Sequence, residues 1–318
     1  MKNGKWLGHG ALWAANIIWG LNAPICKSVL QSADHPAGIA PFALSAYRMI
    51  GAALLFWIAS LFTKRERVPL RDLGGLLIAS IFSIQFNQLL FLWGLSLTSP
   101  IDSSIIATLV PILTMILAAL FLREPITGLK AGGVALGCFG ALLLVYVSHD
   151  GASAASSSVF GDMLCIISCM SYAVYLTTCR DVVIRYSPIT VMKWMFTFAA
   201  VVAAVIYREP LAEVDYAGTS RETWLGVAYV VGCSTFVSYL CLPIGQRYLR
   251  PTIVSIYNYV QPVVAVLFSV LIGLGTLGPA KAIAAACVFG GVWMVTQSKS
   301  RAQLEAEQAA RAESGKTD

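Results

Sequence analysis

Two amides and a proline, Asn258, Gln261 and Pro262, interrupt the apolar segment SIYNYVQPVVAV (residues 255–266). Proline has no backbone N–H and displaces the carbonyl four residues earlier, so Pro262 inside a helix leaves a polar group without its usual partner. In lipid, such a group is tolerated where it is buried in protein or lines a wet cavity. Tyr257, Asn258 and Gln261 share one broad helix face. We predict that this face lines a path for a polar organic solute; hydrogen-bonded helix packing is the alternative.

The segment SIIATLVPILTM (residues 104–115) has the same skeleton, and its Pro111 precedes Pro262 by 151 residues. Each proline removes a backbone hydrogen-bond donor in the middle of an apolar run. We therefore interpret Pro111 and Pro262 as hinges at which two helices bend near the centre of the membrane.

A further polar group lies in FSIQFNQLL (residues 82–90), where Gln85 and Gln88 are three residues apart on one predicted helix. Aromatic rings beside amides suit a moderately polar organic solute, because rings supply contact area and amides fix its orientation. Ordinary packing within a helix bundle is the alternative for every one of these residues. The predicted substrate-binding set is Asn22, Arg48, Gln85, Gln88, Tyr172, Tyr175, Tyr239, Tyr257, Asn258 and Gln261, with Asn16, Trp19 and Asn87 as neighbouring candidates.

Two cations, Arg48 and Lys193, lie inside apolar runs. A charge in such a place is costly and usually faces the bundle interior or a cavity, where it could hold a substrate carboxylate. The alternative is that the long side chain extends to the membrane interface. We favour the interface for Lys193, and both interpretations stand for Arg48.

Carboxylates avoid the middle of the apolar runs: Asp102, Glu124 and Asp162 all lie near the ends. Proton-coupled carriers commonly use intramembrane carboxylates or histidines as relays, so the sequence favours movement down a gradient without proton coupling. The 3 histidines are scattered and supply neither a nucleophile–base pair nor a metal cluster. We therefore predict no enzymatic activity, no cofactor and no metal site.

The composition predicts the environment of these residues. Hydrophobic residues make up 58% of the chain, charged residues only 12%, and the mean hydropathy is +0.74. Soluble domains have about 25% charged residues, so this is an integral membrane protein. The net charge of +6 does not indicate a nucleic-acid partner, because the basic residues are scattered between apolar runs. The first apolar run is too long for a signal peptide and is interpreted as a retained helix.

A membrane-spanning helix needs about 20 apolar residues. Lys and Arg concentrate in alternate loops, for example at Lys64 and Arg67, which predicts that both termini face the cytoplasm. The fold class is thus all-α, with ten transmembrane helices over residues 6–31, 40–63, 73–97, 100–122, 128–148, 160–180, 188–207, 223–246, 250–273 and 279–298.

The chain divides into two halves that match at an offset of 151 residues, with a slip of two residues for the first helix, where WGLNAPICK (19–27) matches YAVYLTTCR (172–180). Because five helices is an odd number, the second half enters the membrane from the opposite side, which makes an inverted-topology repeat. The predicted units are a first five-helix repeat (1–148), an outer connecting loop (149–159), a second five-helix repeat (160–298) and a polar cytoplasmic tail (299–318).

Several of these features together resemble the EamA-type transporters of the drug/metabolite transporter superfamily. They are the five-plus-five arrangement, Trp19-Gly20 in the first helix, Arg48 in the second, the prolines of the fourth and ninth, and an Arg-Glu-Pro motif at 123–125 followed by a Gly-rich helix. The resemblance covers about residues 6–297. The sequence departs from a paired acidic pattern, since Glu124 of the first half corresponds to Gly275 of the second.

The resemblance implies a carrier in the cytoplasmic (inner) membrane that exports amino acids or other small metabolites. Inverted repeats of secondary transporters enclose their site near the midplane, which permits alternating access. Two alternatives stay open: a proton-coupled exporter of drugs or toxic compounds, and a channel or sensor. The expected partners are a small-molecule substrate and the lipid bilayer, and a homodimer is one possibility.

Overall fold

The computed structural model describes residues 2–30, 38–98, 103, 106–148, 159–271 and 278–299. Over these residues the chain is helical, and the sole β contact is an isolated bridge between Leu30 and Ile39. The predicted connecting loop and tail lie outside the described residues, apart from Val159 and Lys299. In chain order the elements are α1 (Lys2–Val29), α2 (Pro41–Ser60), α3 (Leu70–Ser80), η1 (Ile81–Phe86), α4 (Asn87–Leu97), α6 (Leu109–Leu122), α7 (Gly128–Ser148), α8 (Val159–Thr178), α9 (Arg180–Val183), α10 (Pro188–Ile206), α11 (Arg208–Ala212), α12 (Arg221–Tyr229), η2 (Val230–Val237), α13 (Ser238–Tyr248), α14 (Pro251–Ile256), η3 (Tyr257–Tyr259), α15 (Val260–Leu271) and α16 (Pro279–Gln297).

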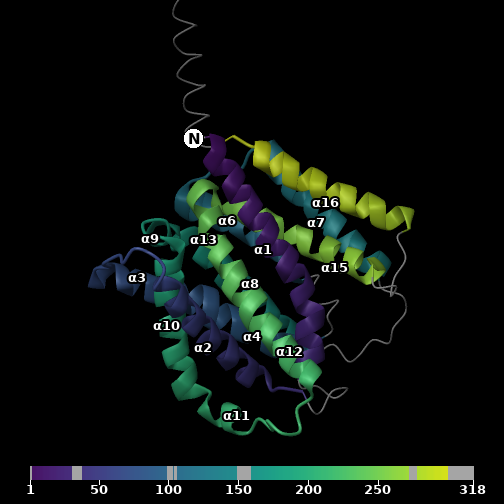
Figure 1. Ribbon diagram of the computed structural model, residues 1–318. Helices are drawn as coiled ribbons and strands as arrows, with labels where there is room; N and C mark the ends of the chain where they lie inside the picture. The colour runs from purple at the N-terminus through teal and green to yellow at the C-terminus, as the bar shows by residue number, and fades with distance from the viewer. Residues whose placement is uncertain are drawn as a thin grey trace, which may run out of the picture.

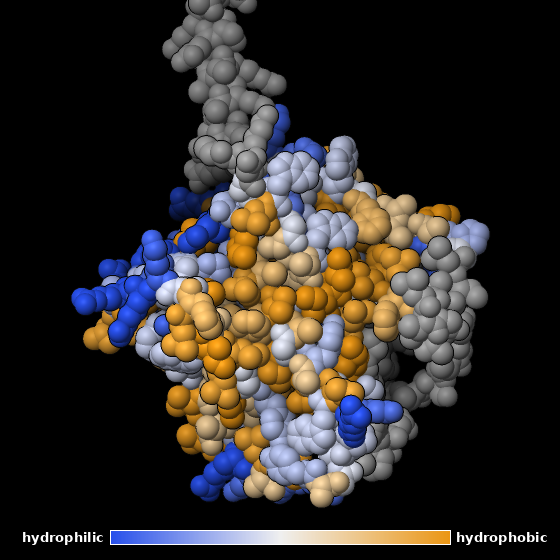
Figure 2. Space-filling model, in the orientation of Figure 1, coloured by the Kyte–Doolittle hydropathy of each residue, from blue (hydrophilic) through white to orange (hydrophobic). Residues whose placement is uncertain are grey.

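Apolar helices make this a multi-pass membrane protein. Among the described residues, 6 helices are long and apolar enough to cross a membrane, and two shorter apolar helices cover Leu109–Leu122 and Gly128–Leu143. Large side chains such as Leu54, Trp57 and Ile58 of α2 are exposed, as expected for a surface that faces lipid. In Figure 2, apolar side chains cover much of the visible face, and hydrophilic residues gather near the start of α3 and beside α11.

Local sequence signals set where several helices begin. Proline occupies the first position of α2, α14 and α16, where the missing N–H would have no partner within the helix. The start of α10 combines Pro188 with Ser187, whose side chain accepts a hydrogen bond from the Thr190 N–H. Ser220 caps α12 in the same way, accepting from the Thr223 N–H at 3.1 Å.

Two long helices each contain a π-helical segment, and the two segments lie at matching places in the halves. The segment η1 (Ile81–Phe86) joins α3 to α4, and η2 (Val230–Val237) joins α12 to α13. Residues 81–86 shifted by 151 fall on residues 232–237, inside η2. Such wide turns occur mostly inside α-helices and frequently at functional sites.

The helix packing is matched between the halves in the same way. α7 packs along α16 and α2 along α10, while α4 packs on α8 and α1 on α13 (Figure 1). At the α7–α16 contact, a Cβ on Gly140 would lie 2.7 Å from the Ala284 carbonyl oxygen, and one on Gly291 would lie 2.6 Å from the Gly133 carbonyl oxygen. Ala284 follows Gly133 by 151 residues, so the same close approach occurs twice. Small residues permit such tight contacts between membrane helices.

The loop before α3 contacts the start of α10 through Glu66. Its carboxylate accepts hydrogen bonds from the Ser187 N–H at 2.9 Å and from the Ser187 hydroxyl at 2.8 Å. Burial raises the pKa of Glu66, but hydrogen bonds from Thr190 and Ser187 and the nearby Arg247 lower it, so the pKa lies below its ordinary value of 4.5. The ionised form of Glu66 therefore stabilises the contact between the two halves.

Replacing this carboxylate tests its contribution. Because the pKa of Glu66 is lower in the folded protein than in the unfolded chain, its ionised carboxylate stabilises the folded state at pH values above the unfolded-state pKa. This stabilisation is lost as the pH falls through the folded-state pKa, which lies below 4.5. We expect Glu66→Gln to lower the Tm by about 1–4 °C at pH 7, with the difference shrinking at pH below 4.5. Glu209→Gln, at an exposed residue, is the control and should leave the Tm unchanged. A Glu66→Gln deficit of equal size at pH 7 and below the pKa would contradict this account.

Candidate substrate-binding site

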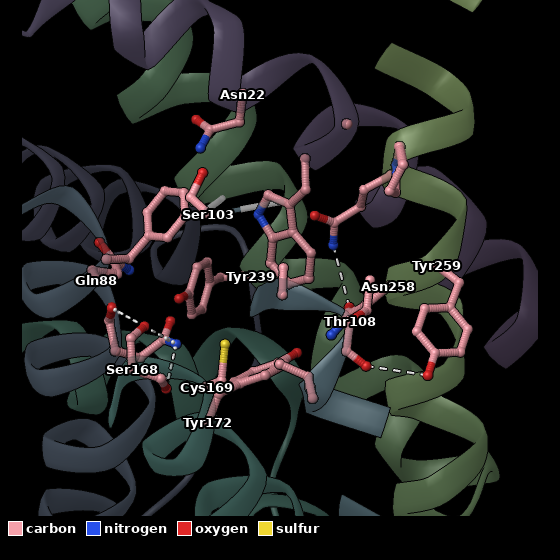
Figure 3. A pocket seen from close by; sticks show the side chains of 18 of the residues that line it. Asn22, Gln88, Ser103, Thr108, Ser168, Cys169, Tyr172, Tyr239, Asn258 and Tyr259 are labelled. Carbon is pink, nitrogen blue, oxygen red and sulfur yellow. Dashed lines mark hydrogen bonds between the residues drawn. The ribbon is translucent and has the colours of Figure 1, made fainter. Parts of the chain in front are cut away.

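A cavity of about 180 Å³ lies between helices of both halves. A single buried water needs only about 10–15 Å³, so the cavity has room for a small organic molecule. Its walls come from α1, α2, α4, α6, α8, α13, η3 and α15 (Figure 3). Of the ten predicted substrate-binding residues, the structure brings seven to this cavity: Asn22, Arg48, Gln88, Tyr172, Tyr239, Asn258 and Gln261. Pro262, predicted as a hinge, also lines it.

Three residues of the predicted set are absent from the cavity wall and contact other parts of the protein. Gln85 donates from Nε2 to the Ser80 hydroxyl at 3.4 Å. Tyr175 donates from its hydroxyl to Gln246 Oε1 at 3.0 Å. The Tyr257 hydroxyl lies 2.7 Å from His9 Nδ1. The role predicted for these residues in binding substrate therefore stays a prediction.

Both predicted hinge prolines lie in the first turn of a helix. Pro111 is the third residue of α6, which follows a turn at Thr108, and Pro262 is the third residue of α15, which follows the 3₁₀ segment η3. In a first turn the missing N–H of proline removes no intrahelical hydrogen bond. The breaks at Thr108 and at η3 come just before the prolines, and a hinge role for Pro111 and Pro262 stays a prediction.

Matched positions of the two halves lie together in the cavity wall. Tyr259 donates from its hydroxyl to the Thr108 carbonyl at 3.1 Å, and these residues are 151 apart. Gln88 and Tyr239, which also line the wall, are separated by the same 151 residues. The cavity therefore lies where equivalent elements of the halves meet.

Aromatic rings form one wall. The Trp19 ring lies edge-on to Tyr239 at 5.8 Å between centroids and to Tyr172 at 6.5 Å. Trp19 is held in place because its Nε1 donates to the Ser234 carbonyl at 2.9 Å. Aromatic contacts of this edge-to-face geometry are favourable, and together they present flat apolar surfaces to a ligand.

Amide groups form the polar part of the wall. Gln261 donates from Nε2 to Asn16 Oδ1 at 2.9 Å and to Asn258 Oδ1 at 3.3 Å. Gln88 is only 2% exposed, and neither its Nε2 nor its Oε1 has a hydrogen-bond partner among the described residues, although the Tyr239 hydroxyl is near. Buried polar atoms are normally paired, so this unpartnered amide indicates a place for ligand or water.

The two intramembrane cations have different surroundings. Arg48 is 4% exposed and lines the cavity. Lys193 is half-buried on α10, and its Nζ lies 4.7 Å from the centre of the Trp57 ring, away from the cavity. The structure thus places Arg48 in the bundle interior and Lys193 outside the cavity, and the extension of Lys193 to the membrane interface stays a prediction.

Several wall residues carry no strong signal in the sequence. Ser168 is one of them; its hydroxyl accepts a hydrogen bond at 3.1 Å from Asn87, a candidate already named from the sequence, and this bond joins α4 to α8. Ser168 and its neighbour Cys169 are small residues typical of packing positions, and nothing in the sequence sets them apart. Thr108 and Tyr259 could have been found from their separation of 151 residues. Among the residues searched, no group of three His, Cys, Asp or Glu side chains could hold a metal ion.

A bundle of apolar helices around a polar cavity belongs to the class of multi-pass membrane transport proteins. The model of the EamA-like transporter family matches residues 6–146 and again residues 159–297. The chain therefore belongs to the EamA-like transporter family, and it is a transporter rather than an enzyme. The double match also agrees with the two halves seen in the sequence.

Similar proteins carry transporter names. The uncharacterized transporter YyaM of Bacillus subtilis is 24% identical over 73% of this chain and 77% of its own length. The uncharacterized inner membrane transporter YedA of Escherichia coli K12 is 24% identical over 91% of this chain and 90% of its own. The WAT1-related protein At5g13670 of Arabidopsis thaliana is 22% identical over 83% of this chain and 78% of its own length. A solved crystal structure shares the fold with a TM-score of 0.73 at 20% identity, over 93% of this chain and 97% of that one.

Proposed function

We propose that the chain is a secondary carrier that moves small organic metabolites, such as amino acids, out of the cell by alternating access. In this mechanism the cavity binds a solute while open to one compartment, and movement of the two halves then opens it to the other. The energy comes from the solute gradient, without ATP and without an obligatory proton.

The observation that carries this proposal is that equivalent residues of the two halves wall one cavity. Gln88 corresponds to Tyr239, Thr108 to Tyr259 and Trp19 to Tyr172. Two similar halves around one site can adopt two related arrangements of similar energy, one open to each side. The wall chemistry supports an organic solute, since it combines aromatic surface with amides and hydroxyls.

The membrane arrangement that we propose has ten spans in two inverted repeats, 1–148 and 160–298, with both termini in the cytoplasm. α1, α6, α7 and the α14–η3–α15 segment lie where four of the ten spans were expected, which supports that number. The odd number of helices in each half supports the inversion, and the Lys and Arg of residues 64–71 support the orientation. Location in the inner membrane is supported by the name of the relative YedA.

Flux measurements on purified protein in liposomes test the mechanism. Uptake across a panel of metabolites should saturate, and preloading the liposomes with unlabelled substrate should accelerate it, because a carrier exchanges solutes. Collapse of a proton gradient should leave this counterflow unchanged. Flux that rises linearly without trans-stimulation would indicate a channel, and a strict proton requirement would indicate the proton-coupled exporter.

Labelling in whole cells tests the arrangement in the membrane. In a variant without native cysteines, Thr63→Cys should be protected from an impermeant thiol reagent, whereas Glu213→Cys should react with it. Reaction of both sites from one side would overturn the inverted repeat, whatever the flux measurements show.

A further inference from the structure

The guanidinium of Arg48 is held in the cavity wall through its Nε atom. Its Nε donates to the Thr235 hydroxyl at 3.0 Å, and Thr235 in turn donates to the Val230 carbonyl at 2.7 Å. Thr235 is fully buried in the π-helical segment η2. The side chain of Arg48 therefore has a defined orientation, in which the π segment holds Nε and leaves the two terminal amino groups for other partners.

Within the described part of the chain, no carboxylate forms an ion pair with Arg48. The ionisable groups that interact with it electrostatically are the Cys26 thiol and the Tyr239 hydroxyl, which are neutral acids rather than carboxylates. Arginine stays protonated in proteins, so the charge cannot be relieved by losing a proton. An uncompensated buried cation is costly, and such residues in membrane proteins usually belong to a substrate or ion pathway.

A second group in the same wall also lacks a partner. Gln88 is nine-tenths or more buried, and neither its donor nor its acceptor makes a hydrogen bond of good geometry to a described residue, although the Tyr239 hydroxyl lies close to the amide. The remaining wall consists of neutral groups, among them the amides of Asn22, Asn258 and Gln261 and the rings of Trp19 and Tyr172. The described wall thus has one fixed positive charge, unpaired amide capacity and aromatic surface.

We propose that the substrate is an organic monocarboxylate with an aromatic or branched apolar body, whose carboxylate pairs with Arg48 and whose body packs on Trp19 and Tyr172. This inference rests on the proposed carrier function and names its substrate class. The planar guanidinium fork matches a carboxylate with two parallel hydrogen bonds. A phosphate monoester carries about −1.5 to −2 charge at neutral pH, more than the single charge of Arg48 compensates.

Binding of a matched series to the purified full-length protein tests the substrate class. The probes share one phenyl body: 3-phenylpropanoate, its amide, 3-phenylpropylamine, phenylalanine and 2-phenylethyl phosphate. We expect the monocarboxylate to bind at least about tenfold more tightly than the amide or the amine, because a hydrogen bond to a charged group is worth about a tenfold or greater change in affinity. Wild-type protein that binds the amide or amine equally well, prefers the phosphate, or binds no monocarboxylate overturns the proposal.

Variants assign the preference to Arg48. Arg48→Gln should weaken 3-phenylpropanoate about 10- to 100-fold and the amide less than about threefold. Arg48→Lys should retain part of the preference because the charge remains. Lys193→Gln removes the same charge outside the cavity and should change no affinity. Equal losses for anion and amide in Arg48→Gln would refute the role of Arg48 in binding the carboxylate.

A second variant serves if Arg48→Gln does not fold. Thr235→Val removes the hydroxyl that orients the guanidinium and should reduce the preference for the anion. An unchanged preference in Thr235→Val would refute the role of Arg48.

Failure of this inference differs from failure of the carrier proposal. Saturable, trans-stimulated flux without a preference for monocarboxylates would refute the substrate class alone. Binding of monocarboxylates that depends on Arg48, without saturable flux of any panel member in liposomes, would refute the carrier and leave the site in place.

Discussion

Gly291→Ala is expected to lower the Tm of the purified protein by about 5 °C or more, because it adds a methyl group where two helix backbones touch. The new Cβ would lie 2.6 Å from the Gly133 carbonyl oxygen and 2.6 Å from the Gly137 nitrogen. Both are backbone atoms, so α7 and α16 must move apart. This cost exceeds the gain of about 1 kcal/mol that alanine brings to a helix over glycine.

The adjacent glycine provides the matched control. A Cβ on Gly290 would meet its nearest neighbour, Leu136 Cδ2, at 3.4 Å, which is ordinary contact with a flexible side chain. Gly290→Ala should therefore leave the Tm unchanged or raise it. Gly140→Ala, in the matching position of the first half, should repeat the loss seen for Gly291→Ala. Thermal unfolding of the three variants in one detergent measures this, and equal Tm values for Gly290→Ala and Gly291→Ala would contradict the close helix contact.

Gln88→Leu is expected to raise the stability of the protein and to slow transport, two opposite effects that a residue with only a packing role would not show. Both polar atoms of the Gln88 amide are buried, and neither makes a hydrogen bond of good geometry, although the Tyr239 hydroxyl is close. An unsatisfied buried group costs about 1–3 kcal/mol. Leucine has a similar size and removes that cost, so the Tm should rise by several degrees. If the amide binds the solute, counterflow of labelled phenylalanine or 3-phenylpropanoate should fall at least about tenfold.

Gln85→Leu is the control, three residues earlier in the same long helix. Gln85 donates to Ser80 and does not line the cavity, so its replacement should lower the Tm slightly and leave counterflow intact. Loss of counterflow in Gln85→Leu would support the sequence-based prediction for this residue. Retained counterflow in Gln88→Leu would remove Gln88 from the binding site.

The location of many apolar helices could be predicted from the sequence, because a membrane-spanning helix is recognised by the length and hydropathy of its own segment. The predicted ranges 40–63, 188–207 and 279–298 contain α2, α10 and α16. The correspondence of the halves was also visible in the spacing of Pro111 and Pro262. Such features are local or repeated, so they can be recognised without knowing the packing.

Which side chains point toward the cavity could not be predicted, because their direction depends on whether the local helix is α, π or 3₁₀. Gln85 and Gln88 are three residues apart and should share a face on a regular α-helix. The π segment η1 ends at Phe86, between them, and only Gln88 lines the cavity. Tyr257 and Gln261 are separated in the same way by the 3₁₀ segment η3, so that Tyr257 contacts His9. These changes of winding have no simple residue signature.

The π-helical segments also determine what a deletion within them would do. A π-helical turn, with hydrogen bonds between residues i and i+5, holds about one residue more than an α-helical turn. Deleting one residue within Ile81–Phe86 should therefore convert this stretch to regular α-helix and leave α3 and α4 nearly in their present directions. A one-residue deletion inside α2 or α10, which contain no such segment, would instead rotate the rest of the helix by about 100°. Homologous chains should thus tolerate a single-residue gap more readily within this stretch than within α2 or α10.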